Sequence, residues 1–420
     1  MTAPRQRDRL RDRPAFVWFW AASTVSDFGT YVTMLAVQVL VVATLAGTAA
    51  DVGLVNAARW LPYPVFGLIA GVLADRLRRR PLLVGTDLSR AVLLAAIPLL
   101  ALGGVLTVPL LAAFMVVFGT LSLINDAAHQ SFLPRLVPGR LLLPANARLQ
   151  QSTAAAQTTG PLLAGGLVAW VGAPLAVLVD AASYLASGVM IARVRAPDSR
   201  PAATARPALI AAVREGLSWV YRHRTLRPFA LAGHAWFLCS SLLATVYVPF
   251  VLRDLGFGAF VLGVTFALAG VGALAGNGLS TRLGAAFGVG RTIAGSRAVE
   301  AAGFALVALA PAGAAGGGWP AVALIAAGQL LFGLGLGAEG PVEMAYRQSV
   351  TPDGLQGRMN STMRSLNRAA IVVGAPLGGL LADAIGNRTA LWIGAAGMAA
   401  GAAAVSMSAL RDARLDLDAG

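Results

Sequence analysis

Six ionisable residues interrupt stretches of the sequence that are otherwise apolar, and these residues are the best placed to do chemistry. They are Asp27, Arg59, Asp126, His234, Glu339 and Glu343. An ionisable side chain in apolar surroundings is costly unless it is paired, hydrogen-bonded or used, so each is a candidate for binding or proton transfer. A carboxylate removed from water also takes up a proton more readily than one in solution. The pattern indicates charge-linked or proton-linked chemistry in an apolar medium.

The lengths of the apolar stretches give the depths of these residues. Residues 15–44 and 51–74 are each long enough for a membrane-spanning helix, which needs about 20 apolar residues. Asp27 lies 12 residues into the first stretch, about 18 Å at 1.5 Å per residue. Arg59 lies 8 residues into the second from the opposite side. Both fall in the same half of a bilayer, where they could pair and line or flank a cavity. His234 could shuttle protons, although a packed helix histidine is the commoner outcome.

Glu339 and Glu343 are four residues apart and therefore share one face of a helix. They lie near the same end of the molecule as Asp126. Three basic residues are expected at comparable depth, namely Arg148, Arg364 and Arg368. This arrangement fits a gate of salt bridges as well as a proton relay, and the sequence leaves both open. We expect the coupling role for Asp27 first and Glu339 second.

The composition requires a lipid environment for most of the chain. Hydrophobic residues make up 57% of the sequence, charged residues make up 12%, and the mean hydropathy is +0.70. A soluble protein of 420 residues needs far more polar surface. We predict an all-α integral membrane protein with twelve transmembrane helices. The predicted spans are 15–44, 51–74, 82–103, 109–130, 141–171, 174–194, 227–252, 258–281, 290–311, 319–345, 357–384 and 389–410.

Arginine sets the predicted orientation. All 33 basic residues are Arg, and 25 of them fall in, or within two residues of, the N-terminal arm 1–14, the loops after the even-numbered spans and the tail 411–420. The loops after the odd-numbered spans hold two, Arg253 and Arg388. Positive charge resists translocation, so the arginine-rich side, with both termini, is expected in the cytoplasm. The net charge of +14 therefore comes from arginines that set the membrane topology, and it does not indicate a nucleic-acid partner. Arginine without lysine is typical of a GC-rich bacterial genome, which suggests the bacterial cytoplasmic membrane.

A hydrophilic segment and an internal repeat divide the chain in two. Segment 195–226 is the longest hydrophilic stretch, and its later part, from Leu209 to Tyr221, has the apolar spacing of an interfacial helix. An offset of 214 residues places residues 138–182 on residues 352–396 without gaps. The matched pairs include Pro138 with Pro352, Asn146 with Asn360, Gly160 with Gly374, Gly165 with Gly379 and Gly172 with Gly386. We predict two pseudo-symmetric six-helix bundles, 15–194 and 227–410, an arrangement typical of secondary transporters.

Residues 71–80, Gly-Val-Leu-Ala-Asp-Arg-Leu-Arg-Arg-Arg, resemble motif A of the major facilitator superfamily, G-x-L-x-D-R-x-G-R-R, with Arg78 replacing the second glycine. The matching positions are Gly71, Asp75, Arg76, Arg79 and Arg80. Asp75 is expected to accept hydrogen bonds from the N–H groups that open the 357–384 helix and to complement its positive dipole end. That contact would form only when the halves close on the cytoplasmic side, and it would favour the outward-facing state. The alternative is that Asp75 merely ends its helix.

A second motif indicates the direction of transport. Gly160-Pro161 followed by Gly165-Gly166 resembles motif C of the superfamily's exporters, with one extra residue between the pairs. Proline and glycine there give a kinked, closely packed helix wall. Residues 59–62 and 133–138 resemble the branch that contains the enterobactin exporters and macrolide efflux proteins. The resemblance implies a proton-driven exporter of a small organic molecule.

Other functions remain as alternatives. Facilitated uptake and movement of lipid between leaflets use the same fold, and a membrane-embedded enzyme or channel is a remote possibility. The chain has no lysine and hence no Walker A motif, which excludes a conventional ATP-driven pump in this chain. We expect no enzyme activity, no cofactor and no metal. The expected partners are a small-molecule substrate, protons and the lipid bilayer, with the protein a monomer.

The arginine distribution gives a direct test of topology. Cysteines near Gly103, Gly172 and Pro311 are expected to react with a membrane-impermeant thiol reagent in intact cells. Cysteines near Arg79, Arg200 and Gly354 are expected to react only after the membrane is permeabilised. Labelling of the second group in intact cells would reverse the orientation.

Overall fold

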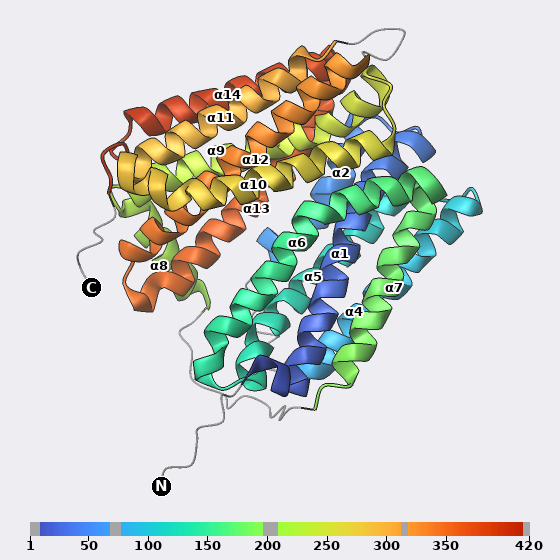
Figure 1. The fold of residues 1–420 in the computed structure, drawn as a ribbon, viewed down its shortest axis with the longest axis horizontal. Coiled ribbons are helices and arrows are strands. Elements are labelled where there is room, and N and C mark those ends of the chain that lie inside the picture. Colours follow the sequence, from blue (N-terminus) through green and yellow to red (C-terminus); the bar gives the residue numbers. More distant parts are fainter. Residues whose placement is uncertain (1–8, 68–76, 196–208, 312–317, 415–420) are drawn as a thin grey trace.

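The structure is a computed structural model that describes residues 9–67, 77–195, 209–311 and 318–414 (Figure 1). Thirteen α-helices account for nearly all of the described residues, which confirms the predicted all-α class. They are α1 (Pro14–Val39), α2 (Ala49–Trp60), α4 (Arg79–Leu102), α5 (Val108–Leu136), α6 (Gly139–Val171), α7 (Ala173–Ala192), α8 (Leu209–Arg222), α9 (Leu226–Pro249), α10 (Ala259–Phe287), α11 (Val289–Leu309), α12 (Gly318–Ser349), α13 (Asp353–Ile385) and α14 (Asn387–Met407). A short 3-10 helix, η1 (Leu10–Asp12), precedes α1.

Ten helical segments of the described chain are long and apolar enough to cross a membrane. The other two predicted spans differ for identifiable reasons. α6 is long, but its first half is rich in polar residues. Span 51–74 breaks after Trp60, because Pro62 has no N–H to continue the helical hydrogen bonds. Helical residues resume at 62–67, and the rest of that span lies partly outside the described residues. The helix predicted in the later part of segment 195–226 is found as α8.

The structure preserves the register of the internal repeat. α6 and α13 both contain 33 residues, and their bounds differ by the predicted 214 residues at each end. Each helix is followed by a glycine in the left-handed region, Gly172 with φ 84° and Gly386 with φ 88°. A side chain is strained at such a φ, so the same turn explains why glycine stands at both positions. α1 and α9 also end alike, in π-helical turns η2 (Leu40–Thr44) and η3 (Phe250–Asp254).

Large apolar side chains on the outer surface fit a lipid solvent. Trp170, Trp319, Met407 and Leu143 are each more than four-fifths exposed. Water would penalise so many large exposed apolar groups, whereas lipid does not. The helices satisfy their own backbone hydrogen bonds, as a lipid-exposed segment must. The chain is therefore a multi-pass membrane protein.

Two pairs of helices join the first six spans to the last six. α2 packs on α13, and α6 packs on α10. The backbones approach closely: a Cβ on Gly165 would lie 2.6 Å from the Ala259 carbonyl oxygen, and one on Gly263 would lie 2.5 Å from the Pro161 oxygen. In the other pair, a Cβ on Gly379 would lie 2.3 Å from the Ala49 oxygen. Gly165 and Gly379 are equivalent in the repeat, so the two contacts are symmetric copies.

Polar contacts reinforce this junction at one end of the molecule. We call it the arginine-poor end, where α1 ends and α2 begins; α1 begins and α14 ends at the opposite, arginine-rich end. The Asp383 carboxylate of α13 accepts hydrogen bonds from the Ala49 and Ala50 N–H groups of α2, each 3.0 Å. Arg253 of η3 donates to the Val42 and Gly47 carbonyl oxygens at 2.9 and 2.7 Å.

The geometry implies that these contacts hold the arginine-poor end closed. Asp383 satisfies two unpaired donors at the N-terminus of α2 and meets its positive dipole end. In Figure 1 the helices of the two halves diverge toward the end where N and C are marked. Opening the arginine-poor end must break both the Asp383 and the Arg253 contacts.

Asp383→Asn is expected to shift the equilibrium toward a conformation open at the arginine-poor end. The loss of a charge–dipole contact costs about 0.3–1 kcal/mol when exposed. Spin labels at Leu102 and Trp319, both well exposed, report the separation of the two halves at this end in a Cys239→Ser background. The population at longer inter-label distance should rise severalfold.

The matched control is Asp254→Asn at the same end. Asp254 accepts a hydrogen bond from Asn387 at 2.9 Å, and both residues belong to the second half. The control should leave the distance distribution unchanged. Equal distributions for Asp383→Asn and the unsubstituted protein would mean that the carboxylate does not hold this end closed.

Candidate functional site

An arginine–aromatic cluster lies where the two halves meet at mid-depth. The Arg368 guanidinium of α13 lies 3.9 Å from the ring centre of Trp60 on α2, and 5.8 Å from that of Tyr63. Arg59 lies 5.5 Å from the same Trp60 ring and 5.4 Å from Phe118. A guanidinium over an aromatic face is attracted by the ring quadrupole. Trp60 thus contacts cations from both halves.

Asp126 of α5 is the acid of this cluster. It accepts a hydrogen bond of 2.9 Å from the Tyr63 hydroxyl. Arg90, Arg364 and Arg368 are the cations whose charge acts on it, and no ion pair within 4 Å holds it in the described chain. Tyr63 therefore joins the acid of one half to the arginine of the other. Sequence analysis identified Asp126 and Arg368 but missed Tyr63, which lies four residues after Arg59 in the same interrupted helix.

Asp27 lies half-buried on α1, where it accepts a 2.7 Å hydrogen bond from Thr153 of α6. Tyr31, one turn further on, lies within electrostatic range of both Asp27 and Arg59. The structure does not join Asp27 to Arg59 in an ion pair. Arg59 turns instead toward the aromatic rings of Trp60 and Phe118. In the described part of the chain, the Asp27 carboxylate is therefore held by a neutral hydrogen-bond donor and not by a cation.

The acids of the second half have partners of their own. Glu339 and Arg297 form a buried ion pair at 3.1 Å between α12 and α11. Glu343 pairs with Arg347 one turn further along α12 at 3.6 Å. Glu300, which is fully buried, accepts a hydrogen bond from the Trp236 indole. Arg297 lies three residues before Glu300 on α11 but pairs with Glu339, because α12 brings that carboxylate against it.

His234 has hydrogen bonds at both ring nitrogens. Nδ1 lies 2.7 Å from the Asn367 amide oxygen on α13, and Nε2 lies 2.8 Å from the Tyr221 hydroxyl on α8. An amide oxygen can only accept, so Nδ1 carries a proton and donates. The histidine therefore fixes α8 to α9 and α13.

The expected gate arginines do not pair in this conformation. Arg148 and Arg364 are exposed, and the described residues include no ion pair for either of them. Of motif A, Gly71, Asp75 and Arg76 lie outside the described residues. Arg79 donates to the Ser131 hydroxyl at 3.1 Å, and Arg80 donates to the carbonyl oxygens of Ile191 and Ala192. These two arginines fix the start of α4 against α5 and α7.

The four motif C residues have distinct surroundings. A Cβ on Gly160 would meet Tyr31 of α1 at 2.8 Å, so this glycine lets α6 pack on α1. Pro161 and Gly165 contact Gly263 of α10 across the junction of the halves. Gly166 faces open space. The motif therefore places α6 against one helix from each half.

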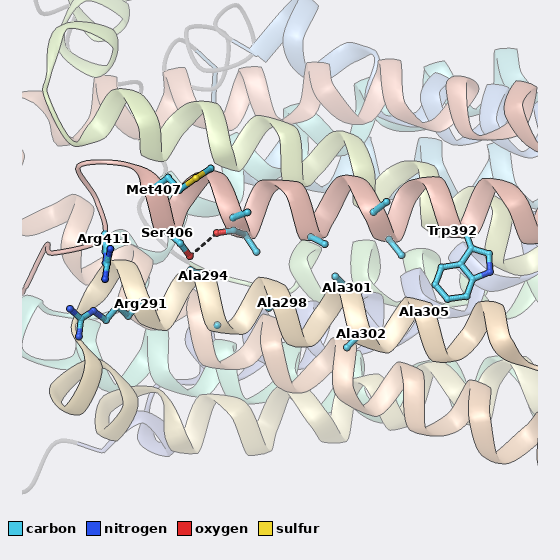
Figure 2. A pocket seen from close by; sticks show the side chains of 16 residues that line it. Arg291, Ala294, Ala298, Ala301, Ala302, Ala305, Trp392, Ser406, Met407 and Arg411 are labelled. Atoms are coloured by element: carbon cyan, nitrogen blue, oxygen red, sulfur yellow. Dashed lines mark hydrogen bonds between the residues drawn. The ribbon is translucent and has the colours of Figure 1, made fainter.

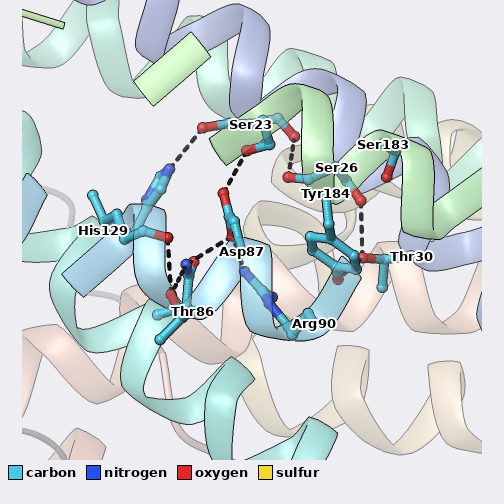
Figure 3. A network of polar contacts seen from close by, with 12 residues as sticks. Ser23, Ser26, Thr30, Thr86, Asp87, Arg90, His129, Ser183 and Tyr184 are labelled. Atoms are coloured by element: carbon cyan, nitrogen blue, oxygen red, sulfur yellow. Dashed lines mark hydrogen bonds and ion pairs between the residues drawn. The ribbon is translucent and has the colours of Figure 1, made fainter. Parts of the chain in front are cut away.

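Sequence analysis missed a buried polar network beside α1 (Figure 3). Asp87 and Arg90 form a buried pair on α4, and Asp87 also accepts hydrogen bonds from Asn125 at 3.0 Å and Ser187 at 2.7 Å. Arg90 lies 4.1 Å from the ring centre of Tyr184. The signal in the sequence was an acid and an arginine three residues apart inside the apolar run 82–103. The network fixes α4, α5 and α7 together around the first helix.

A cavity of about 970 Å³ lies away from the Trp60 cluster, between α11 and α14 on the outside of the molecule (Figure 2). A cavity of about 30 Å³ lies beside Arg59, between α1, α2 and α5. In the described part of the chain, no group of three His, Cys, Asp or Glu side chains is arranged to hold a metal ion.

Comparison with known proteins decides the family. The profile of the family described as "Transmembrane secretion effector" matches residues 10–419, nearly the whole chain. The chain belongs to this family. It is a transporter of the major facilitator superfamily and not an enzyme. This confirms the resemblance drawn from the motif A and motif C residues.

Individual relatives of this transporter support the assignment. The multidrug efflux pump Tap of Mycobacterium tuberculosis strain H37Rv is 28% identical over 422 residues, covering 96% of this chain and 95% of Tap. The uncharacterized transporter y4rN of Sinorhizobium fredii is also 28% identical, over 77% of this chain and 79% of its own. Among solved structures, the nucleoside transporter NupG has a TM-score of 0.75 at 10% identity, covering 93% of this chain and 98% of NupG. The last similarity shows the fold alone.

Proposed function

We propose that this secretion effector is a proton-coupled antiporter that exports a small hydrophobic or amphiphilic molecule by alternating access. The bundles 15–194 and 227–410 would rock against each other about the α2–α13 and α6–α10 contacts. Both termini and the arginine-rich end would face the cytoplasm of a bacterium, with the protein acting as a monomer in the cytoplasmic membrane. The relation to Tap supports export over uptake.

The observation that carries the proposal is the Trp60 cluster between the two halves. Arg368 reaches across the junction to Trp60 and Tyr63, and Tyr63 in turn binds Asp126. An aromatic group of a substrate can take the place of the Trp60 ring against Arg59 or Arg368. A cationic group of a substrate can take the place of either arginine against Trp60. Binding there would alter the contact between the halves, as alternating access requires.

Asp27 is the proposed site of proton coupling. Among the described residues its hydrogen bond comes from Thr153, a neutral donor, and no cation of that part of the chain lies within hydrogen-bond distance. A half-buried acid without a paired cation exchanges protons more readily than one in an ion pair. Glu339 is the second choice, because its pairing with buried Arg297 stabilises the charged form. Protonation of Asp27 in one conformation and release in the other would link substrate exit to proton entry.

The described conformation fits the inward-facing stage of this cycle. The polar and glycine contacts between the halves described above lie at mid-depth and toward the arginine-poor end. We propose that Asp75 makes the corresponding contact at the arginine-rich end, at the N-terminus of α13, in the outward-facing state. Arg148, Arg364, Glu339 and Glu343 would then approach one another to complete a cytoplasmic gate. Facilitated uptake by the same rocking motion is the alternative.

Asp27→Asn is expected to abolish uptake driven by a pH gradient into inverted membrane vesicles. Amphiphilic fluorescent dyes, with ethidium among them, serve as the test substrates. Downhill dye exchange without a gradient should persist, because the amide keeps an acceptor for Thr153 but cannot lose a proton. Asp27→Glu should restore part of the gradient-driven transport.

Glu339→Gln is the matched control for the choice of residue. It should impair stability or both transport modes together, because it leaves buried Arg297 without its partner. If the Asp27→Asn variant still accumulates dye in response to a pH gradient, the coupling proton binds at another residue. Equal dye movement with and without a gradient in the unsubstituted protein would instead favour facilitated transport.

A further inference from the structure

The outer groove between α11 and α14 lies apart from the transport path. Both helices sit at the edge of the molecule farthest from α4 and α7 (Figure 1). α11 packs on α12 and α14, and α14 packs on α9 and α11. The groove between them therefore opens to the surrounding lipid and not to the junction of the halves.

The walls of the groove are formed almost entirely by small side chains. The wall residues of α11 are Ala294, Gly295, Ala298, Ala301, Ala302 and Ala305. Those of α14 are alanines over one face, with Trp392 at one end and Met407 at the other. Small residues on both helices leave a furrow of about 970 Å³ that protein side chains do not fill. Such a furrow accepts a linear apolar chain from the membrane.

Two arginines stand at the arginine-rich mouth of this furrow. Figure 2 shows Arg291 and Arg411 near each other at one end and Trp392 at the other. Asp412 is the only acid paired with either one among the described residues, at 3.6 Å from Arg291. That pair is largely exposed, and exposed pairs are weak. The first amide of α11, that of Val289, is already bonded to the Ala413 carbonyl oxygen, and the two guanidinium groups supply donors for a ligand.

The groove is long enough for an acyl chain. Arg291 and Ala305 are 14 residues apart on α11, which corresponds to about 21 Å along the helix. Half of the hydrocarbon core, which is about 30 Å thick in all, is about 15 Å deep, so an acyl chain from one leaflet fits along the groove. Arg291 lies in the first turn of α11 and Arg411 follows the end of α14, so both guanidinium groups are at the arginine-rich end, where lipid headgroups lie.

We infer that the α11–α14 groove is a binding site for one anionic phospholipid, with an acyl chain along the alanine furrow and its phosphate on Arg291 and Arg411. Guanidinium groups bind phosphate oxygens through charge-assisted hydrogen bonds. An anionic headgroup is favoured over a zwitterionic one because, among the described residues, one weakly held acid pairs with these two cations. This site is independent of the proposed transport function.

The test uses the full-length purified protein in detergent and native mass spectrometry. Dioleoyl phosphatidylglycerol and dioleoyl phosphatidylcholine are titrated separately, because they share acyl chains and differ in net charge. The unsubstituted protein should bind one phosphatidylglycerol at least tenfold more tightly than phosphatidylcholine. Arg291→Gln with Arg411→Gln should weaken phosphatidylglycerol binding by roughly 30-fold, taking each arginine near a lipid surface as a factor of about five.

Two further variants separate the headgroup from the furrow. Arg224→Gln with Arg227→Gln removes two exposed charges near the same end but outside the groove, and it should leave binding unchanged. Ala302→Trp fills the furrow without changing charge and should weaken the binding of phosphatidylglycerol. Equal affinity for both lipids, or full affinity in the Arg291/Arg411 variant, would overturn the inference. Displacement of bound lipid by glycerol 3-phosphate alone would reduce the site to a phosphate site and would also overturn it.

Discussion

The close approach of two symmetric helix pairs is the contact on which the rest of the structure depends. α6 meets α10 and α2 meets α13 at positions where a single added methyl group would lie within 2.3–2.6 Å of a backbone oxygen. In lipid, where apolar burial gives little drive for association, such backbone contact is a main source of helix affinity. It places Trp60 of α2 against Arg368 of α13. The same approach lets the Asp383 carboxylate reach the first amides of α2.

The interior of each half is fixed by polar contacts, whereas the junction between halves relies on few. Glu339 and Arg297 form a buried ion pair between two helices of the second half. In the first half, Asp87 of the buried Asp87–Arg90 pair on α4 accepts hydrogen bonds from Asn125 of α5 and Ser187 of α7. Breaking a buried pair is costly, so these helices move together. The junction instead uses backbone packing, one stacked guanidinium and hydrogen bonds at the arginine-poor end. A protein that must separate its halves in every cycle needs this difference in cohesion.

Sequence patterns anticipated the elements better than the contacts. The repeat offset of 214 residues gave the bounds of α13 from those of α6, because Pro and Gly fix where a helix begins and ends. The apolar spacing from Leu209 to Tyr221 predicted α8, because apolar residues that repeat at the helical period line one face of a helix. Asp27 and Arg59 were placed at similar depth, which helix rise alone determines. Their side chains do not meet, because the rotation of each helix about its axis depends on packing, and this rotation sets where a side chain points. Packing likewise determines that Arg297 of α11 meets Glu339 of α12. The Asp87 network was overlooked because its partners come from three helices.

Arginine in the middle of the protein has an electrical consequence. The guanidinium keeps its charge at every pH at which a protein folds, so Arg368 cannot discharge when the halves separate. Moving one elementary charge through a membrane potential of 100 mV changes the free energy by about 2.3 kcal/mol. If α13 carries Arg368 through even a fraction of the membrane field as the halves rock, the balance between the two conformations depends on voltage. The cell's membrane potential would then set the resting conformation of this transporter, separately from any pH gradient.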